Sequence, residues 1–314
     1  MNSKNDIMSP CCGDDTMFAP SVAANNFGMN DRIKRLRKES FDAAPSLSIE
    51  RALIETRFYK ENEGKYPIPV LRALNFLEVC KNKTIYIGKD ELIVGERGPR
   101  PKAVPTFPEL TCHSVEDLHV LNTRELQRYT ISQEDIDTYE KEVIPYWKGR
   151  TQRERIFSHV PQEWRSAYEV GMFTEFMEQR APGHTALDGK VYKYGLLDLK
   201  ERIKKELDAL DFMNDPEATD KQEELKAMSI SCDAAIIFAE RHADLADEMS
   251  LTEKDPKRVE ELKKIAEVCR WVPAHAPRNY WEAIQMYWFV HLGTITELNL
   301  SLIHISEPTR PLYI

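Results

Sequence analysis

Apolar residues recur every three or four positions along most of this chain, a spacing that places them on one face of an α-helix. The longest pattern runs from residue 222 to residue 249 and predicts the longest helix. Capping residues or prolines mark where several helices begin. Helical segments are predicted at 32–40, 49–62, 69–77, 132–147, 150–156, from 161 to a turn at 182, 199–210, 222–249, 256–269 and 279–292. The sequence is therefore expected to be mainly α-helical.

The period of the pattern changes between residues 84 and 95. Thr-Ile-Tyr-Ile is followed by Gly-Lys-Asp and then by Glu-Leu-Ile-Val-Gly, which is typical of two short strands joined by a turn. We therefore expect a short β-hairpin here. The proline-rich stretch at 98–108 is expected to form an irregular covering loop.

Residues 283–292 are apolar nearly all round the predicted helix. A helix of this kind is normally covered by protein on every side, so we expect it to be central. His291 lies within it. On such a helix a histidine is more often a hydrogen-bonded core residue than a ligand.

The stretch at 168–185 combines a helical pattern with a sharp turn. Trp164, Tyr168, Met172 and Phe176 are each four positions apart, which predicts one aromatic and apolar face. Pro182 cannot extend that helix and Gly183 permits a tight turn. His184 follows directly, so it is either a polar group at the edge of an apolar pocket or a core histidine after a helix stop.

Charge and terminal composition exclude some classes of function. The net charge of −9 argues against general affinity for nucleic acid or for anionic membranes. No apolar run reaches the roughly 20 residues that span a bilayer, and no apolar secretory segment precedes the first helix. We therefore predict a cytoplasmic protein. Residues 1–28 are polar and aperiodic, and they are predicted to be a disordered extension.

The six cysteines show no CxxC pair and no zinc-ligand spacing, so no metal site is predicted. Cys80, Cys232 and Cys269 lie on apolar helix faces and should behave as small hydrophobic residues. Cys112 is next to His113, but the side chains of sequence neighbours usually diverge. A nucleophilic pair at this position is therefore not expected.

Three motifs resemble the N-terminal third of a known enzyme family. They are Glu-Leu-Ile-Val-Gly at 91–95, Val-Pro-Ala-His-Ala-Pro at 272–277 and Asn-Tyr-Trp-Glu-Ala-Ile-Gln-Met-Tyr-Trp-Phe-Val-His-Leu at 279–292. The resemblance is to the glycyl radical enzymes of the pyruvate formate-lyase-like group, and it extends over 29–299. Within that group, residues 172–185 resemble the branch that dehydrates trans-4-hydroxy-L-proline.

The resemblance implies a fold and an activity for the complete enzyme. The implied fold is a ten-stranded α/β barrel wrapped by helices. The implied reaction begins when a radical stored on a backbone glycine passes to a cysteine at the barrel centre. The thiyl removes a hydrogen atom from the small amino-acid substrate, and the hydroxyl leaves as water to give 1-pyrroline-5-carboxylate. A radical S-adenosylmethionine iron–sulfur activating enzyme would install the radical, and the complete enzyme is expected to be a homodimer.

The resemblance also assigns site residues. Phe176 matches a phenylalanine that packs on the substrate ring, and His184 matches a histidine that hydrogen-bonds the substrate. The family's catalytic cysteine, its glutamate and the radical glycine have no counterpart in this chain, and none of its six cysteines takes their place. No catalytic residue, metal ligand or bound cofactor is predicted here, and this chain by itself is expected to be inactive.

The sequence departs from the family pattern after residue 299. Residues 300–310 resemble the translation of a sequencing-library adapter, so we predict a non-native tail at 300–314 and an enzyme part at 29–299. Two alternatives remain open. One is a glycyl radical lyase with another substrate, such as choline, isethionate or a diol. The other is a non-catalytic helical interaction module.

Overall fold

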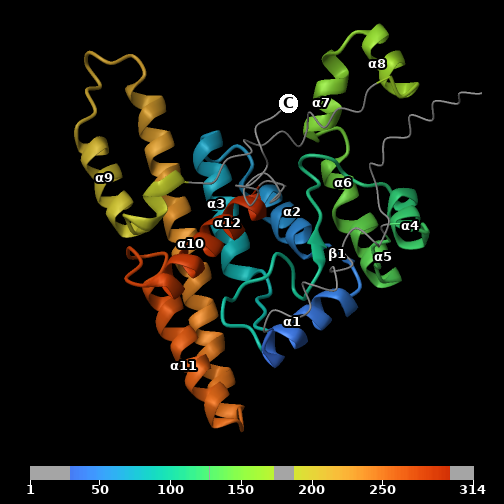
Figure 1. Ribbon diagram of the computed structural model, residues 1–314. Coiled ribbons are helices and arrows are strands. Elements are labelled where there is room, and N and C mark those ends of the chain that lie inside the picture. Colours follow the sequence, from blue (N-terminus) through green and yellow to red (C-terminus); the bar gives the residue numbers. More distant parts are fainter. Residues whose placement is uncertain (1–28, 127, 173–186, 298–314) are drawn as a thin grey trace, which may run out of the picture. The chain divides into compact units, whose positions relative to one another are not determined.

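A computed structural model describes residues 29–126, 128–172 and 187–297 (Figure 1). The chain divides into two compact units, residues 1–42 and 43–314. The described part of the first unit includes helix α1 (Asp31–Asp42), which has no buried residue. Lys34 pairs with Asp31 at 3.1 Å on its surface, and Lys38 pairs with Asp42. The basic stretch predicted at 32–40 is thus a solvated helix.

The described part of the second unit is mainly helical, with one small sheet. Its elements are β1 (Ser46–Ser48), α2 (Glu50–Asn62), α3 (Ile68–Asn82), β2 (Ala103–Pro105), α4 (Val115–Thr123), α5 (Gln133–Glu142), α6 (Ile144–Trp147), α7 (Gln152–His159), α8 (Gln162–Glu169), the 3₁₀ helix η4 (Asp188–Tyr192), α9 (Leu196–Asp208), α10 (Ala218–Thr252), α11 (Pro256–Trp271) and α12 (Tyr280–Glu297).

The helix-start signals in the sequence correspond to real caps. The Asp255 side chain accepts a hydrogen bond from the Lys257 N–H at 3.0 Å, and Pro256 occupies the first turn of α11. Asn279 likewise accepts from the Glu282 N–H at 3.1 Å at the start of α12. The long pattern at 222–249 lies inside α10, which spans 35 residues. Local sequence therefore determines where these helices begin.

Several helices begin or end a few residues away from the prediction, and the helix predicted at 132–147 divides into α5 and α6. The N-cap of α2 is Ile49, which makes no side-chain cap hydrogen bond, and Ser46–Ser48 before it forms strand β1. Helix α8 begins after Pro161 as predicted but ends at Glu169, so Met172 lies beyond it. Gly171 adopts φ +72°, a left-handed conformation that ends a helix readily.

The predicted hairpin at 84–95 is wrong, because residues 84–97 contain no strand. In the described chain β1 and β2 pair in parallel instead, with Ser46 opposite Ala103. Strand β2 lies inside the stretch that was expected to be irregular. We refer to residues 84–97 as the strap, because this segment crosses the helices without forming a strand.

Side chains from two helices take the place of a partner strand for the strap. Arg258 of α11 donates to the carbonyl oxygens of Gly88 and Glu91 at 2.9 and 2.8 Å. Three side chains four and three positions apart on α12 continue the series. The Trp281 indole donates to the Leu92 carbonyl at 2.9 Å, and the Trp288 indole donates to the Gly95 carbonyl at 2.8 Å. Between them, the Gln285 amide accepts from the Val94 N–H and donates to the Val94 carbonyl, at 2.8 Å each.

Replacing Gln285 with methionine is expected to lower the free energy of unfolding by about 2–4 kcal/mol, because both backbone groups of buried Val94 lose their partner. Urea denaturation of the two proteins measures the difference. The control is Gln133→Met on the exposed surface of α5, which should change stability by less than about 0.5 kcal/mol. Equal stability of Gln285→Met and the unaltered chain would show that solvent replaces these bonds.

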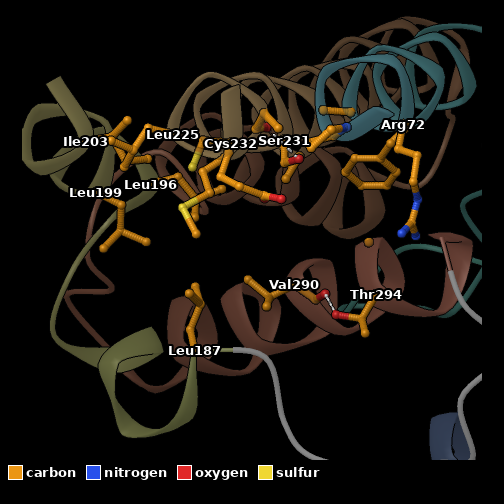
Figure 2. Close-up of a pocket in the computed structure, with 18 of the residues that line it drawn as sticks. Arg72, Leu187, Leu196, Leu199, Ile203, Leu225, Ser231, Cys232, Val290 and Thr294 are labelled. Atoms are coloured by element: carbon orange, nitrogen blue, oxygen red, sulfur yellow. Dashed lines mark hydrogen bonds between the residues drawn. The ribbon is translucent and has the colours of Figure 1, made fainter. Parts of the chain in front are cut away.

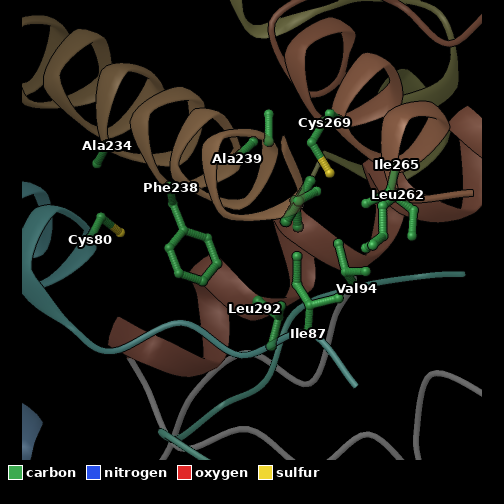
Figure 3. Close-up of a cluster of buried hydrophobic side chains, with 14 of the residues drawn as sticks. Cys80, Ile87, Val94, Ala234, Phe238, Ala239, Leu262, Ile265, Cys269 and Leu292 are labelled. Atoms are coloured by element: carbon green, nitrogen blue, oxygen red, sulfur yellow. The ribbon is translucent and has the colours of Figure 1, made fainter. Parts of the chain in front are cut away.

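The largest core cluster lies where α3, the strap, α10, α11 and α12 meet (Figure 3). Phe238 of α10 packs edge-to-face on Phe289 of α12, with ring centroids 6.1 Å apart. Strap residues Ile87 and Val94 are buried in the same cluster. The strap therefore acts as a core layer, which explains why it needs apolar residues without being a strand.

A second cluster joins β1 and α2 to α4, α5 and α6, and a buried ion network lies beside it. Arg51 of α2 donates to Glu55 and to Glu109 at 2.7 Å each. Its Nε donates to the Thr296 carbonyl at 2.7 Å, close to the end of α12. One guanidinium thus connects the two parts of the core.

His242 of α10 is completely buried, and its Nδ1 hydrogen-bonds the Phe238 carbonyl at 2.8 Å. Burial, together with the charges of Lys83 and Arg241, lowers the pKa of His242 from 6.5 to about 4, although the hydrogen bond to the Phe238 carbonyl acts in the opposite direction. As the pH falls from 6.5 to 4, the His242 imidazole of the unfolded chain is therefore protonated before that of the folded chain. The free energy of unfolding should drop by about 3 kcal/mol across that window.

The measurement for His242 is the urea midpoint at pH 7 and at pH 4.5. His242→Phe should lose this part of the acid dependence, whereas His119→Phe, whose side chain is exposed on α4, should keep it. The difference between the variants separates the histidine from the carboxylates that titrate in the same range. Parallel pH profiles for the two variants would contradict the assignment.

Candidate functional site

The predicted site residues Phe176 and His184 both lie outside the described residues. The structure therefore leaves their proposed partnership untested. It does describe the chain on either side of them, together with the helices among which the chain continues at Leu187.

An aromatic cluster precedes the predicted site. Trp164 and Tyr168 of α8 stack with ring centroids 5.6 Å apart, as their four-residue spacing indicated. Phe157 of α7 packs edge-on against both rings at 5.4 and 5.1 Å. Arg153 of α7 donates to the Tyr168 hydroxyl at 2.8 Å, which joins α7 to α8.

The chain after the predicted site begins with two left-handed residues. Leu187 has φ +68° and Asp188 has φ +50°, values that are rare for a bulky residue such as leucine. Leu187 packs against a third core cluster, made by η4, α11 and α12. Val191 of η4 is buried in that cluster, and it holds this entry point in place.

A cavity of about 850 Å³ lies between α3, α9, α10 and α12, and Leu187 lines it (Figure 2). Its volume is in the usual range for ligand pockets of proteins. Most of its lining is apolar. The apolar lining residues include Phe76, Leu187, Leu196, Leu199, Ile203, Leu225, Met228 and Val290.

The polar groups inside this cavity are already engaged. The Ser231 hydroxyl donates to the Ala227 carbonyl at 2.9 Å and the Thr294 hydroxyl to the Val290 carbonyl at 3.0 Å, each within its own helix. Burial raises the pKa of the Cys232 thiol to about 11. These groups are therefore poorly suited to nucleophilic or acid–base chemistry.

The other described thiols are buried or partly buried as well. Burial raises the pKa of Cys112 to about 11 and also raises that of Cys269. The Cys112 sulfur lies 3.8 Å from the Tyr139 hydroxyl and 3.8 Å from the His113 carbonyl oxygen. Cys80 is buried in the main core. Of the three cysteines predicted to behave as small hydrophobic residues, Cys80 and Cys269 are buried and Cys232 is partly buried.

Helix α12 supplies the wall between the strap and the cavity. Trp281, Gln285 and Trp288 bind the strap, while Val290 and Thr294 line the cavity. The predicted central position of this helix is confirmed, since its buried residues include Met286, Phe289 and Leu292. His291 is also buried, and its ring stacks on Tyr287 and Trp288 with centroids 6.0 and 5.6 Å away.

Burial and then the charge of Arg97 lower the pKa of His291, so a neutral imidazole is favoured. Within 29–126, 128–172 and 187–297, no three His, Cys, Asp or Glu side chains are placed to hold a metal ion. None of the helices in those ranges is long and apolar enough to cross a membrane.

Comparison with known families gives one match that covers most of the chain. Residues 29–312 match the pyruvate formate lyase-like (PFL-like) family. This chain belongs to that family of glycyl radical enzymes. The sequence resemblance is confirmed, although the division between an enzyme part and a tail at residue 299 stays a prediction.

Individual relatives support the same membership. The chain is 49% identical over 273 residues to trans-4-hydroxy-L-proline dehydratase of Clostridioides difficile, covering 87% of this chain and 35% of the dehydratase. The crystal structure of that hydroxyproline dehydratase, with trans-4-hydroxy-L-proline bound, superposes with a TM-score of 0.83 over the same shares.

More distant relatives act on other substrates. Isethionate sulfite-lyase of Nitratidesulfovibrio vulgaris is 32% identical over 268 residues, which cover 81% of this chain and 32% of that enzyme. The B12-independent glycerol dehydratase of Clostridium butyricum, solved in its glycerol-bound form, is 31% identical with a TM-score of 0.81, covering 86% of this chain and 34% of its own. This chain thus spans about a third of the length of these relatives.

The cavity was not anticipated from the sequence. Its walls come from α3, α9, α10 and α12, which together extend from residue 68 to residue 297. Sequence periodicity indicates an apolar face on each helix but not which faces leave a gap between them. The family resemblance pointed to Phe176 and His184, which precede the lining residue Leu187 in the sequence. It did not indicate the cavity itself.

Proposed function

We propose that this chain forms the N-terminal part of a glycyl radical dehydratase that converts trans-4-hydroxy-L-proline to 1-pyrroline-5-carboxylate and water. The observation that carries the proposal is the difference in identity between relatives. The hydroxyproline dehydratase is 49% identical, whereas the isethionate lyase is 32% and the glycerol dehydratase 31% identical over similar lengths.

The proposed contribution of this chain is binding and shielding. We infer that the Phe176 ring packs on the pyrrolidine ring of the substrate and that the His184 imidazole hydrogen-bonds one of its polar groups. The buried wall of α12 and the strap supports this role, because radical chemistry requires a site from which water is excluded. The radical itself would be supplied by residues beyond this chain and by the activating enzyme.

The expectation that this chain is inactive by itself rests on the family resemblance. The cysteine, the glutamate and the radical glycine of the family's reaction have no counterpart in this sequence. The ten-stranded barrel, the homodimer and the cytoplasmic location belong to the same proposal. They rest on the family resemblance and on the sequence.

The test is an anaerobic turnover assay on a polypeptide of the relatives' length that contains this sequence, together with its activating enzyme and S-adenosylmethionine. Trans-4-hydroxy-L-proline, isethionate, choline, glycerol and 1,2-propanediol are offered separately. Formation of 1-pyrroline-5-carboxylate from hydroxyproline alone is expected. Turnover of another compound in the panel, without turnover of hydroxyproline, would indicate a glycyl radical lyase with that other substrate.

Variants connect the activity to the proposed residues. His184→Gln and Phe176→Ala should each lower kcat/KM by about 10²-fold or more, because both residues are proposed to contact the substrate. The matched control is His119→Gln, whose side chain is exposed on α4. Unchanged kinetics in His184→Gln would remove that residue from the site and leave the reaction itself standing.

A different glycyl radical lyase activity is the second candidate. It is favoured by the isethionate, glycerol and sulfopropanediol enzymes among the relatives, the last of which, from Klebsiella oxytoca, is 29% identical. The helical interaction module has no such support, since these relatives are all enzymes.

A further inference from the structure

Arg51 of α2 holds the end of α12, although 245 positions separate the two bonded residues in the sequence. The Arg51 Nε donates to the Thr296 carbonyl oxygen at 2.7 Å. Thr296 is the last residue but one of α12, and the last four carbonyl groups of a helix have no partner within that helix. A guanidinium at this end also complements the negative pole of the helix dipole. One side chain therefore fixes the last turn of the helix that separates the strap from the cavity.

The Arg51 side chain is itself held in one orientation. Its Nη2 and Nη1 donate to the two carboxylate oxygens of Glu109 at 2.7 and 3.1 Å, and Nη1 also donates to Glu55 at 2.7 Å. The guanidinium lies over the Phe107 ring, 4.2 Å from its centre. A planar fork bound in this way is fixed in direction as well as in position, and a lysine ammonium cannot reproduce that geometry.

Stability is a weak reason for placing these charges in the core. The side chains of Arg51 and Glu55 are 5% and 2% exposed, so both charges are removed from water. An apolar pair of similar volume is often at least as stable as a buried ion pair, because it avoids the cost of desolvation. The ion network adds a fixed direction, and the bond from the Arg51 Nε to the Thr296 carbonyl carries that direction to α12.

The same helix holds the chain that follows the proposed substrate site. Leu187 is the third residue after His184, and it packs against the core cluster that contains Val290 of α12 (Figure 2). Leu187 and Asp188 have φ +68° and +50°, a left-handed conformation that costs free energy in residues other than glycine. Such strain persists only where the surrounding structure imposes it, and it concentrates at functional sites. The end of α12 thus borders a strained corner of the chain next to the proposed site.

We infer that Arg51 is a positioning residue for the reaction of the complete enzyme. Arg51 fixes the end of α12, α12 holds Leu187, and Leu187 fixes the point at which the chain leaves the proposed substrate site. In this role Arg51 acts through α12 and not by contact with the substrate. The inference rests on the proposed function in one respect, because it takes Phe176 and His184 to contact the substrate. It holds for any substrate that these two residues contact.

The test uses a polypeptide of the relatives' length and two variants that leave no uncompensated charge on Glu55. Arg51→Lys keeps the positive charge but loses the Nε–H that bonds the Thr296 carbonyl. The double variant Arg51→Met with Glu55→Met removes both charges of the ion pair. Each should lower kcat/KM at least about tenfold, because a small misplacement of substrate-contacting groups is costly for the reaction. Circular dichroism at the assay temperature verifies that the variants are folded.

Hydrogen exchange measured by mass spectrometry gives a second readout that requires no turnover. Both variants should exchange faster than the unaltered enzyme in peptides from 187–192 and from the last turns of α12. Exchange in α7, which makes none of these contacts, should stay the same. The matched control is Arg57→Met on the same helix, where the side chain is 61% exposed and pairs with Glu142. This variant should change neither kcat/KM nor exchange.

Two results would overturn the inference. One is an unchanged kcat/KM in Arg51→Lys, which alone decides the kinetic question if the double variant does not fold. The other is a lower kcat/KM without faster exchange at 187–192, because α12 would then not connect Arg51 to the site. Kinetics are measured with whichever compound of the substrate panel the unaltered enzyme converts. Lack of turnover of hydroxyproline would therefore contradict the proposed dehydratase reaction and leave this test intact.

Discussion

Arg51→Ala is expected to lower the free energy of unfolding by about 3–5 kcal/mol, the usual cost of removing one partner of a buried ion pair. The side chains of Arg51 and Glu55 are 5% and 2% exposed. Without the guanidinium, the Glu55 carboxylate would lose its ion pair at 2.7 Å and keep the hydrogen bond from Asn75 at 3.2 Å. A buried carboxylate that has lost its cation is costly because water cannot solvate it.

The cost extends beyond the carboxylates. The Arg51 guanidinium lies 4.2 Å from the centre of the Phe107 ring, and its Nε holds the Thr296 carbonyl at 2.7 Å. Loss of these contacts loosens the end of α12 as well as α2. We therefore expect the urea midpoint to fall, with hydrogen exchange increased at the C-terminal turns of α12.

A surface pair on the same helix provides the control for Arg51. Arg57 of α2 bonds Glu142 at 3.0 Å, but its side chain is 61% exposed. Arg57→Ala should therefore cost less than about 1 kcal/mol. The double variant Arg51→Met with Glu55→Met should recover much of the stability lost in Arg51→Ala, since no buried charge remains at these two positions. Similar losses for Arg51→Ala and Arg57→Ala would contradict this reading.

Gly195→Ala is expected to destabilise the chain by about 3 kcal/mol, at the upper end of the cost of overpacking. A Cβ at this position would lie 2.2 Å from the Ala274 carbonyl oxygen and 2.4 Å from the His275 Cα. Both are backbone atoms, and two hydrogen bonds join the same segments. These are Leu196 N–H to the Pro273 carbonyl at 2.8 Å and Leu197 N–H to the Ala274 carbonyl at 3.0 Å.

Gly189→Ala is the matched control, six residues earlier in η4. A Cβ there meets no atom within 4 Å, so the change should alter stability by less than about 0.5 kcal/mol. Thermal or urea unfolding of the two variants measures the difference. If Gly195→Ala were as stable as Gly189→Ala, the junction between α9 and the 273–275 loop would have to be looser than the structure shows.

Helical periodicity was sufficient to predict most of the helices. In α11 the apolar stripe and the Asp255 cap lie close together in sequence, so local rules decide the outcome. The end of α8 was harder to predict. The apolar spacing continues through Met172, but the described helix stops at Glu169, where the left-handed Gly171 turns the chain.

The strap shows why a strand pattern can mislead. Alternating apolar residues indicate that one side of a segment is buried, but they do not reveal what bonds its backbone. At Val94 the partner is the side-chain amide of Gln285, almost 200 residues further along the chain. No local signal in residues 84–97 could identify that partner.

For the candidate site, too, some features follow from the sequence and others only from the tertiary structure. The sequence alone determined the helices, the family and the expectation that Phe176 and His184 contact substrate, because periodicity, caps and motifs are local properties. The tertiary structure decided that the strap is a core layer bonded by α11 and α12, and that the helix faces leave an apolar cavity. These features depend on which distant surfaces meet, and packing, hydrogen bonding and burial settle that choice only in the folded chain.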